Sequence, residues 1–101
     1  MLIYNITYNV ETLIEAEWLE WMKKVHIEEI LKTNYFSDHR ILRLINENSD
    51  ASATTYAVQF TAMNISDVER YLANQGAVLQ KKLIAKFGQK VLLFMTILEE
   101  V

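Results

Sequence analysis

His26 is the residue of this sequence whose type and position best suit chemistry. It lies one helical turn after Met22 and one turn before Ile30, at the border of an apolar stripe. A histidine at such a border can act as a general base, or can hydrogen-bond a ligand held between a helix and a sheet. The simpler alternative is an imidazole that is hydrogen-bonded to the backbone and has no ligand. His26 is therefore the candidate catalytic residue, with both interpretations open.

Four further residues are candidates for ligand binding: Trp21, Asn5, Tyr56 and Gln59. Trp21 could line a pocket beside His26, or simply pack in the core, as aromatic residues at helical spacing usually do. If the protein is an enzyme, Tyr56 and Gln59 would shape the same pocket. Asn5 and Gln59 alternate with the aromatic residues of their strands, so they would form a polar patch on the sheet. This patch could bind a small polar ligand, but we favour a wet contact between two sheets.

Other chemistry has little support. The chain has no cysteine, and His26 and His39 fall on different elements without a paired metal-ligand spacing. Gly76 and Gly88 lie on or just after the second expected helix, so neither belongs to a phosphate-binding loop. We therefore expect no metal and no cofactor. The net charge of -3 offers no positive field to phosphate backbones, which makes nucleic acid an unexpected partner.

Length and composition suit one domain. The chain has 101 residues, 51% of them hydrophobic, which is enough for a real core. Its first apolar run is broken by Asn5, Asn9 and Glu11, a pattern that fits neither a signal peptide nor a membrane span. We expect a single cytoplasmic domain over residues 1–101 that does not engage a membrane.

Alternating and β-branched runs predict four strands, near residues 2–10, 38–46, 54–63 and 90–98. The polar stretch 46–50 would be the hairpin loop between the second and third strands. Apolar residues at helical spacing predict two helices, near residues 12–33 and 66–87.

Capping signals mark the helix ends. Thr12 with Glu15, and Ser66 with Glu69, have the spacing of capping boxes at the helix starts. Gly88 is the expected terminator of the second helix.

The element order β-α-β-β-α-β predicts an α+β domain of ferredoxin-like type, a four-stranded antiparallel sheet with two helices on one face. The other face would be open. The strands near 38–46 and 90–98 are apolar on both sides, so the open face needs a cover. A second copy of the sheet is the simplest cover, and we therefore expect a homodimer formed through the sheet.

Three stretches together resemble a known family. They are residues 18–27 with the pattern W-x-x-W-M-x-x-x-H-I, residues 55–60 and residues 3–5. They are similar to the bacterial domain-of-unknown-function 4286 family, over nearly the whole chain. The resemblance implies a ferredoxin-like protomer of the dimeric α/β-barrel kind, a superfamily that includes small monooxygenases, isomerases and ligand-binding regulators. It implies no activity, because that family has none assigned.

Two functions follow from these observations. The preferred one is a small dimeric module without catalysis, with or without a small-molecule ligand. The alternative is a cofactor-independent enzyme of the dimeric α/β-barrel type, a small monooxygenase or isomerase, with His26 as acid or base. A cavity that contains His26 would favour the enzyme, and a filled core would favour the module.

Overall fold

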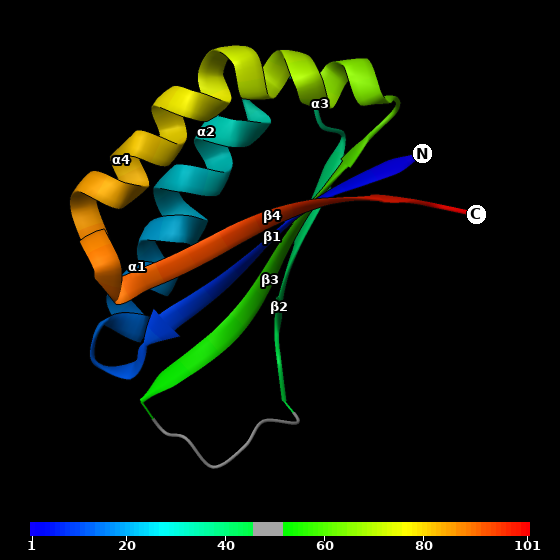
Figure 1. The fold of residues 1–101 in the computed structure, drawn as a ribbon. Helices are drawn as coiled ribbons and strands as arrows, with labels where there is room; N and C mark the ends of the chain where they lie inside the picture. The colour runs from blue at the N-terminus through cyan, green and yellow to red at the C-terminus, as the bar shows by residue number, and fades with distance from the viewer. Residues whose placement is uncertain (46–51) are drawn as a thin grey trace.

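A four-stranded antiparallel sheet with its helices on one face forms the body of the computed structural model (Figure 1). The structure describes residues 1–45 and 52–101, so the expected loop at 46–50 lies outside the described residues. The sheet order is β2-β3-β1-β4. The strands are β1 (Leu2–Glu11), β2 (Asp38–Arg43), β3 (Ala53–Ala62) and β4 (Val91–Glu99). The predicted order of strands and helices is confirmed.

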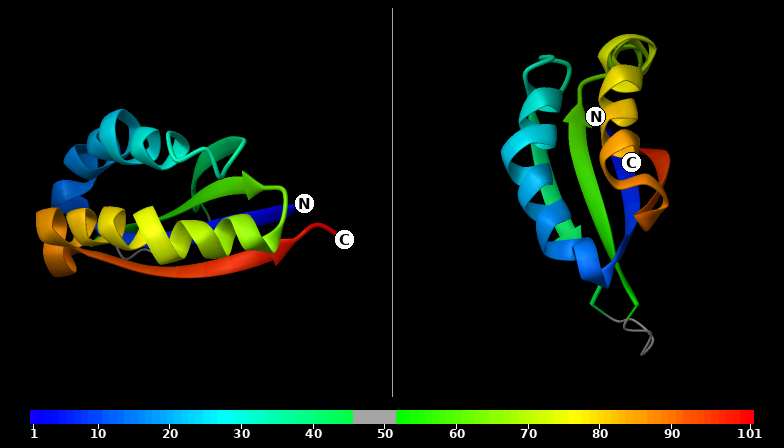
Figure 2. Two further views of the ribbon diagram at one scale, coloured as in Figure 1. Left: turned by 90° about the horizontal axis from the view of Figure 1, so that it is seen from above. Right: turned by 90° about the vertical axis from the view of Figure 1, so that its left-hand side faces the viewer.

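Each predicted helix is present as a run of short helical pieces with a π-helical turn inside it. The first run comprises η1 (Thr12–Ile14), α1 (Glu15–Trp21), the π turn η2 (Met22–His26) and α2 (Ile27–Leu31). The second comprises α3 (Ile65–Tyr71), the π turn η3 (Leu72–Gly76), α4 (Ala77–Phe87) and the short η4 (Gly88–Lys90). Figure 2 shows the two runs side by side on the same face of the sheet.

The capping box predicted at Thr12 is wrong. The backbone N–H of Glu15 donates to the carbonyl of Thr12 rather than to its side chain. The Glu15 carboxylate does not fold back onto its own helix, because it accepts hydrogen bonds from Tyr56 and Thr54 of β3, at 2.5 and 3.2 Å. A contact with a distant strand has thus taken the place of a local cap.

The second capping box, Ser66 with Glu69, is also wrong, by two residues. Asn64 is the N-cap of α3, and its side-chain oxygen accepts from the backbone N–H of Asp67 at 3.0 Å. Asn64 has the extended backbone that an N-cap requires, whereas Ser66 already lies inside the helix. The predicted end of the second helix is correct, since Gly88 follows α4 with a φ of 58° that favours glycine.

Strand β1 lies at the centre of the sheet and divides its side chains between two faces. It pairs with β3 on one side and β4 on the other, antiparallel in both cases. Successive residues of a strand point to opposite faces. Tyr4, Ile6 and Tyr8 therefore lie beneath the helices, on what we call the covered face. Asn5 and Thr7 lie on the open face, on which none of the described helices packs (Figure 1).

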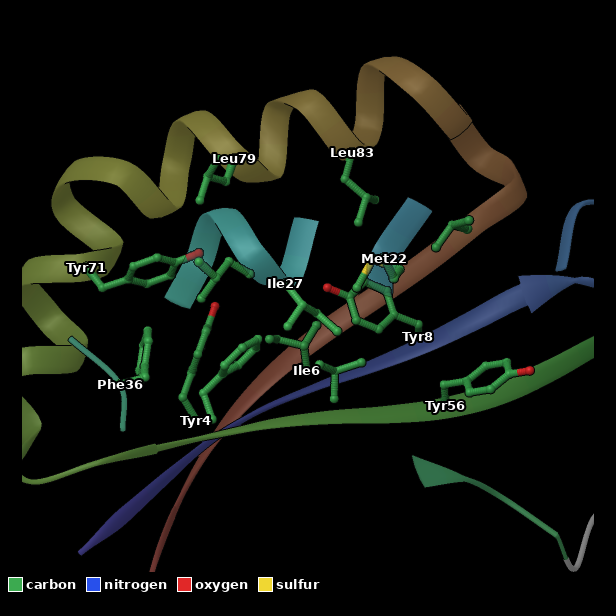
Figure 3. Packing of buried hydrophobic residues seen from close by; sticks show 14 of the residues in the cluster. Tyr4, Ile6, Tyr8, Met22, Ile27, Phe36, Tyr56, Tyr71, Leu79 and Leu83 are labelled. Carbon is green, nitrogen blue, oxygen red and sulfur yellow. The ribbon is translucent and has the colours of Figure 1, made fainter. Parts of the chain in front are cut away.

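The core fills the space between the covered face and the helices. Trp18, Met22 and Phe60 are completely buried there. Aromatic rings are prominent: Phe36 stacks on Tyr4 with 5.8 Å between ring centroids and meets the edge of Tyr71 at 5.1 Å (Figure 3).

Candidate functional site

A small cavity remains between the helices and the covered face of the sheet. Its polar lining residues are Tyr4 and Tyr8 of β1, His26 of η2, Tyr71 of α3 and Gln80 of α4. In Figure 3 the hydroxyl groups of the three tyrosines point toward a common space beneath α4. The cavity volume is about 20 Å³, which suits a molecule of the size of water. The core is thus nearly filled, apart from a small gap lined by these polar groups.

His26 is the candidate site residue that the structure places in this cavity. It is only 4% exposed, and its ring stacks on Trp21 with 4.9 Å between ring centroids. Its Nδ1 atom is buried and has no hydrogen-bond partner among the described residues. A buried ring nitrogen without a partner costs about 1–3 kcal/mol, so such atoms are rare unless a ligand or water satisfies them. The simpler alternative, an imidazole hydrogen-bonded to the backbone, therefore does not hold for the Nδ1 atom within the described residues.

The surroundings of His26 keep its imidazole neutral. The pKa of His26 is lowered from 6.5 to about 4, and the main cause is burial; Glu29 opposes the shift, and Lys82 adds to it. Lys82 and Glu29 form an ion pair of 3.1 Å between Nζ and Oε2. At neutral pH the imidazole is therefore uncharged, and only one of its two nitrogens carries a proton.

The cavity tyrosines remain protonated over the whole physiological range. Burial raises the pKa of Tyr4 to about 12. Burial also raises the pKa values of Tyr8 and Tyr71 well above their usual range, and the neighbouring tyrosines add to the shift. The Tyr4 hydroxyl donates to the sulfur of Met95 on β4 at 2.8 Å. The cavity therefore offers hydroxyl donors and a neutral imidazole, all within an apolar surround.

The two π turns meet at this cavity. His26 is the last residue of η2, Gly76 is the last residue of η3, and both line the cavity. A Cβ at Gly76 would lie 2.8 Å from Cε2 and 2.9 Å from the carbonyl oxygen of Tyr71, so only glycine lets the tyrosine lie where it does. Such π turns often occur at functional sites. Gly76 has a low helix propensity, but it is needed here because it leaves room for the Tyr71 side chain that lines the cavity.

Two of the predicted ligand-binding residues lie on the other face of the sheet. Gln59 donates from Nε2 to Oδ1 of Asn5 at 3.2 Å, and Nδ2 of Asn5 donates to the hydroxyls of Thr7 and Thr96, also at 3.2 Å. The polar patch expected from the sequence is present. It does not share a pocket with His26, because the sheet lies between them.

The other two predicted residues lie on the covered face. Trp21 is half-buried and packs between His26 and the edge of Phe87, so it supports the imidazole rather than lining the cavity. Tyr56 lies toward the opposite end of the core from Tyr71 (Figure 3). Its hydroxyl donates to Glu15 and accepts from Nε of Arg43 at 3.3 Å. Tyr56 is therefore part of a separate network.

Sequence reasoning missed most of the cavity lining. A functional His26 is expected near an inward-facing residue of the first or third strand, and Tyr4 and Tyr8 are such residues, but the sequence does not single them out. Tyr71 and Gln80 belong to the second helical run, and their approach to the first depends on how the two runs pack. The one available signal was Gly76, because a glycine inside a helix often has a packing reason.

The fold defines a ferredoxin-like domain, with two β-α-β halves and a single antiparallel sheet. More specifically, residues 1–101 match the family described as domain of unknown function (DUF4286), and the chain belongs to that family. No curated protein matches the chain.

Solved structures share the fold at low sequence identity. A protein of the ethyl tert-butyl ether (EthD) family from Bacillus halodurans is 18% identical, with a TM-score of 0.76 and complete coverage of both chains. A dimeric ferredoxin-like protein from an uncultured marine organism is 11% identical, with a TM-score of 0.65, covering 99% of this chain and 98% of the other. A candidate antibiotic biosynthesis monooxygenase from Deinococcus radiodurans is 17% identical, with a TM-score of 0.58, covering 100% and 93%. These similarities establish the fold alone.

Within residues 1–45 and 52–101, no helix is long and apolar enough to cross a membrane. In the same part of the chain, no group of three or more His, Cys, Asp or Glu side chains could hold a metal ion.

Proposed function

We propose that the protein is a homodimeric module, joined through the open faces of two sheets, that binds a small molecule in the cavity at His26. Two observations on one side chain carry the ligand site: the buried Nδ1 atom of His26 has no partner among the described residues, and His26 lines the cavity. A ligand or ordered water that satisfies this nitrogen would recover the desolvation penalty that the fold otherwise bears.

The distribution of apolar side chains on the open face supports the dimer. Leu92 and Phe94 of β4 are 60% and 61% exposed there, and Leu42 of β2 is also exposed. These strands form the two edges of the sheet, so apolar side chains flank a polar centre around Asn5. Covering such edges removes apolar area from water at about 25 cal/mol per Å². A second copy fits because it offers the same surface, and a dimeric ferredoxin-like protein shares this fold.

The lining of the cavity supports binding of a small molecule. It brings polar groups from β1, η2, α3 and α4 to one place beside apolar side chains, and such convergence of polar groups is typical of ligand sites. The π turns η2 and η3 bring these groups together, at the expense of regular helical hydrogen bonding.

A thermal-shift screen of small molecules tests the ligand site. Wild type, His26→Ala and the control His39→Ala, which removes an exposed histidine of β2, would be compared side by side. We expect at least one compound to raise the melting temperature of wild type and His39→Ala but not of His26→Ala. Equal responses in all three proteins would reject the site.

One observation favours a second function, that of a cofactor-independent enzyme such as a small monooxygenase or isomerase. The neutral imidazole of His26 can accept a proton from a substrate, and the Tyr4 hydroxyl can donate to an oxygen that gains negative charge. A base with a pKa of about 4 is weak at neutral pH, however, so we rank this function second.

Solvent exchange tests the enzymatic alternative. Incubation in deuterium oxide with an enolisable ketone should introduce deuterium next to the carbonyl group with wild type, and not with His26→Ala. The same exchange rate in both proteins would reject His26 as a base.

A further inference from the structure

Met95 forms the part of the cavity wall that faces solvent. It lines the cavity, and yet it is 42% exposed. Its strand β4 is an edge strand: Met95 pairs with Ile6 of β1, and no further strand among the described residues covers it. A methionine side chain is unbranched and turns about three bonds, which lets it change conformation at small cost. Leu83 of α4, which also lines the cavity, is buried at 1% exposure and has no such freedom.

The Tyr4 hydroxyl is held by a weak partner. It donates to the Met95 sulfur at 2.8 Å, while the Tyr4 side chain is otherwise buried. A thioether sulfur is a poor hydrogen-bond acceptor, and a carbonyl oxygen is a much better one. A ligand oxygen that displaced the sulfur would therefore improve the bonding of this hydroxyl.

No charged side chain lines the cavity within the described part of the chain. The charged side chains that shift the pKa of His26 are Glu29 and Lys82, which are paired with each other. An ionised ligand would lose its hydration without gaining an opposite charge, and that loss is far more costly than the burial of an uncharged polar group. The lining therefore selects against ions of either sign.

We infer that Met95 is a displaceable plug and that the ligand is a small uncharged molecule with a carbonyl group, which replaces the Met95 sulfur at the Tyr4 hydroxyl and reaches Nδ1 of His26. This inference rests on the proposed ligand site. It explains why a cavity of about 20 Å³ can serve a larger molecule, because the thioether occupies the space that the ligand takes. Entry is from the exposed edge of β4, between that strand and the helices.

Two isosteric probes test the inference, propionamide and propionate, which differ in charge and hardly in shape. The protein would carry ¹³C in its methionine methyl groups, so that the Met95 methyl resonance reports displacement of the plug directly. Met63, which is 70% exposed, supplies an internal control for nonspecific effects. We expect propionamide to shift the Met95 and His26 resonances in a saturable manner, and propionate to shift neither.

Two variants on the same strand separate the plug from the general packing of β4. Met95→Ala removes the plug, and we expect propionamide to bind roughly 3- to 10-fold more tightly, with the His26 resonance as reporter. Ile97→Ala is the matched control, because Ile97 lies on the same face of β4, is 43% exposed and does not line the cavity. We expect its affinity to stay within about 2-fold of wild type.

The outcomes distinguish the plug from the ligand site itself. Equal binding of propionate, unchanged affinity in Met95→Ala, or an equal gain in Ile97→Ala would overturn the inference. If a screened compound binds in a His26-dependent way while Met95→Ala has no effect on it, the plug is rejected and the site stands. If neither propionamide nor any screened compound moves the His26 resonance in wild type or Met95→Ala, both proposals fail.

Discussion

Among the described residues, Asn5 on the open face and His26 on the covered face are both buried, and the two sites differ in whether the buried polar atoms have partners. On the open face, Asn5 is 8% exposed, and its amide bonds to Gln59 and two threonines. On the covered face, His26 is 4% exposed, and its Nδ1 atom has no hydrogen-bond partner among the described residues. A satisfied buried amide stabilises the protomer, whereas an unsatisfied imidazole calls for a further molecule.

The apolar side chains show the reverse contrast. The covered face holds a closed core of aromatic and aliphatic residues, but the open face leaves Leu92 and Phe94 in solvent. On the open face, the buried amide of Asn5 has its hydrogen bonds, but apolar side chains remain exposed to solvent. On the covered face, the apolar side chains are buried, but the Nδ1 atom of His26 has no hydrogen-bond partner among the described residues. The exposed apolar side chains of the open face suit a protein partner with a matching surface, and the unpartnered nitrogen of His26 suits a small polar ligand.

The largest effect should come from a charge on the open face. Phe94→Glu would place a carboxylate in the proposed sheet contact, and we expect the dimer dissociation constant to rise at least about 100-fold because the charge must lose its hydration. Light scattering after size exclusion at micromolar concentration should then give one chain mass, 11.8 kDa, in place of two. Leu13→Glu, at a side chain that is 96% exposed on η1, should remain dimeric. A monomeric wild type would refute the dimer.

The next effect concerns pH and the covered face. The pKa of His26 falls from 6.5 unfolded to about 4 folded, so the unfolded chain binds the proton more readily between these values. His26 therefore leaves the free energy of unfolding at its full value above pH 6.5, where the imidazole is neutral in both states. As the pH falls from 6.5 toward 4, the unfolded chain takes up the proton first, and the free energy of unfolding decreases. We expect wild type to lose about 3 kcal/mol of unfolding free energy over this window relative to His26→Gln.

Denaturant unfolding at a series of pH values measures this difference. His39→Gln is the matched control, because it removes an exposed histidine of β2 and leaves His26 in place. Parallel curves for wild type and His26→Gln would show that the imidazole is not held neutral by burial.

A third prediction concerns the π turn that places Tyr71 in the cavity. Gly76→Ala should lower the free energy of unfolding by about 2 kcal/mol, because the new Cβ would lie 2.9 Å from the Tyr71 carbonyl oxygen. Helix propensity alone predicts the opposite sign, a gain of about 1 kcal/mol. Chemical denaturation decides between the two. Gln75→Ala, at an exposed position in the same turn, should change the stability by less than about 0.5 kcal/mol.

The smallest effect should come from the polar centre of the open face. Asn5→Ala removes three side-chain hydrogen bonds and should cost about 1–2 kcal/mol in denaturant unfolding. Asn9→Ala is the control, since Asn9 is exposed and donates one long hydrogen bond of 3.4 Å to Thr55. We expect it to cost less than about 0.5 kcal/mol. Equal costs would mean that the Asn5 network contributes no more than a surface contact.

Sequence reasoning correctly predicted what depends on neighbours along the chain. The alternation of Tyr4 and Tyr8 with Asn5 predicted both the first strand and its two unlike faces. Helical spacing placed His26 at the border between helix and sheet, where the structure has it. The apolar residues on both sides of the last strand predicted the exposed patch around Phe94. Each of these signals has a fixed period, two for a strand and 3.6 for a helix, which a single segment already displays.

The tertiary structure decided what depends on contacts between distant segments. Both capping boxes failed where another partner competed, and Glu15 shows this most clearly because it bonds to β3 rather than to its own helix. The π turns have no periodic signature, and Gly76 acquires its meaning only from the Tyr71 ring against it. The meeting of His26, Tyr71 and Met95 at one cavity joins residues from three elements, and it arises from the packing of two helical runs on a twisted sheet, which no local pattern encodes.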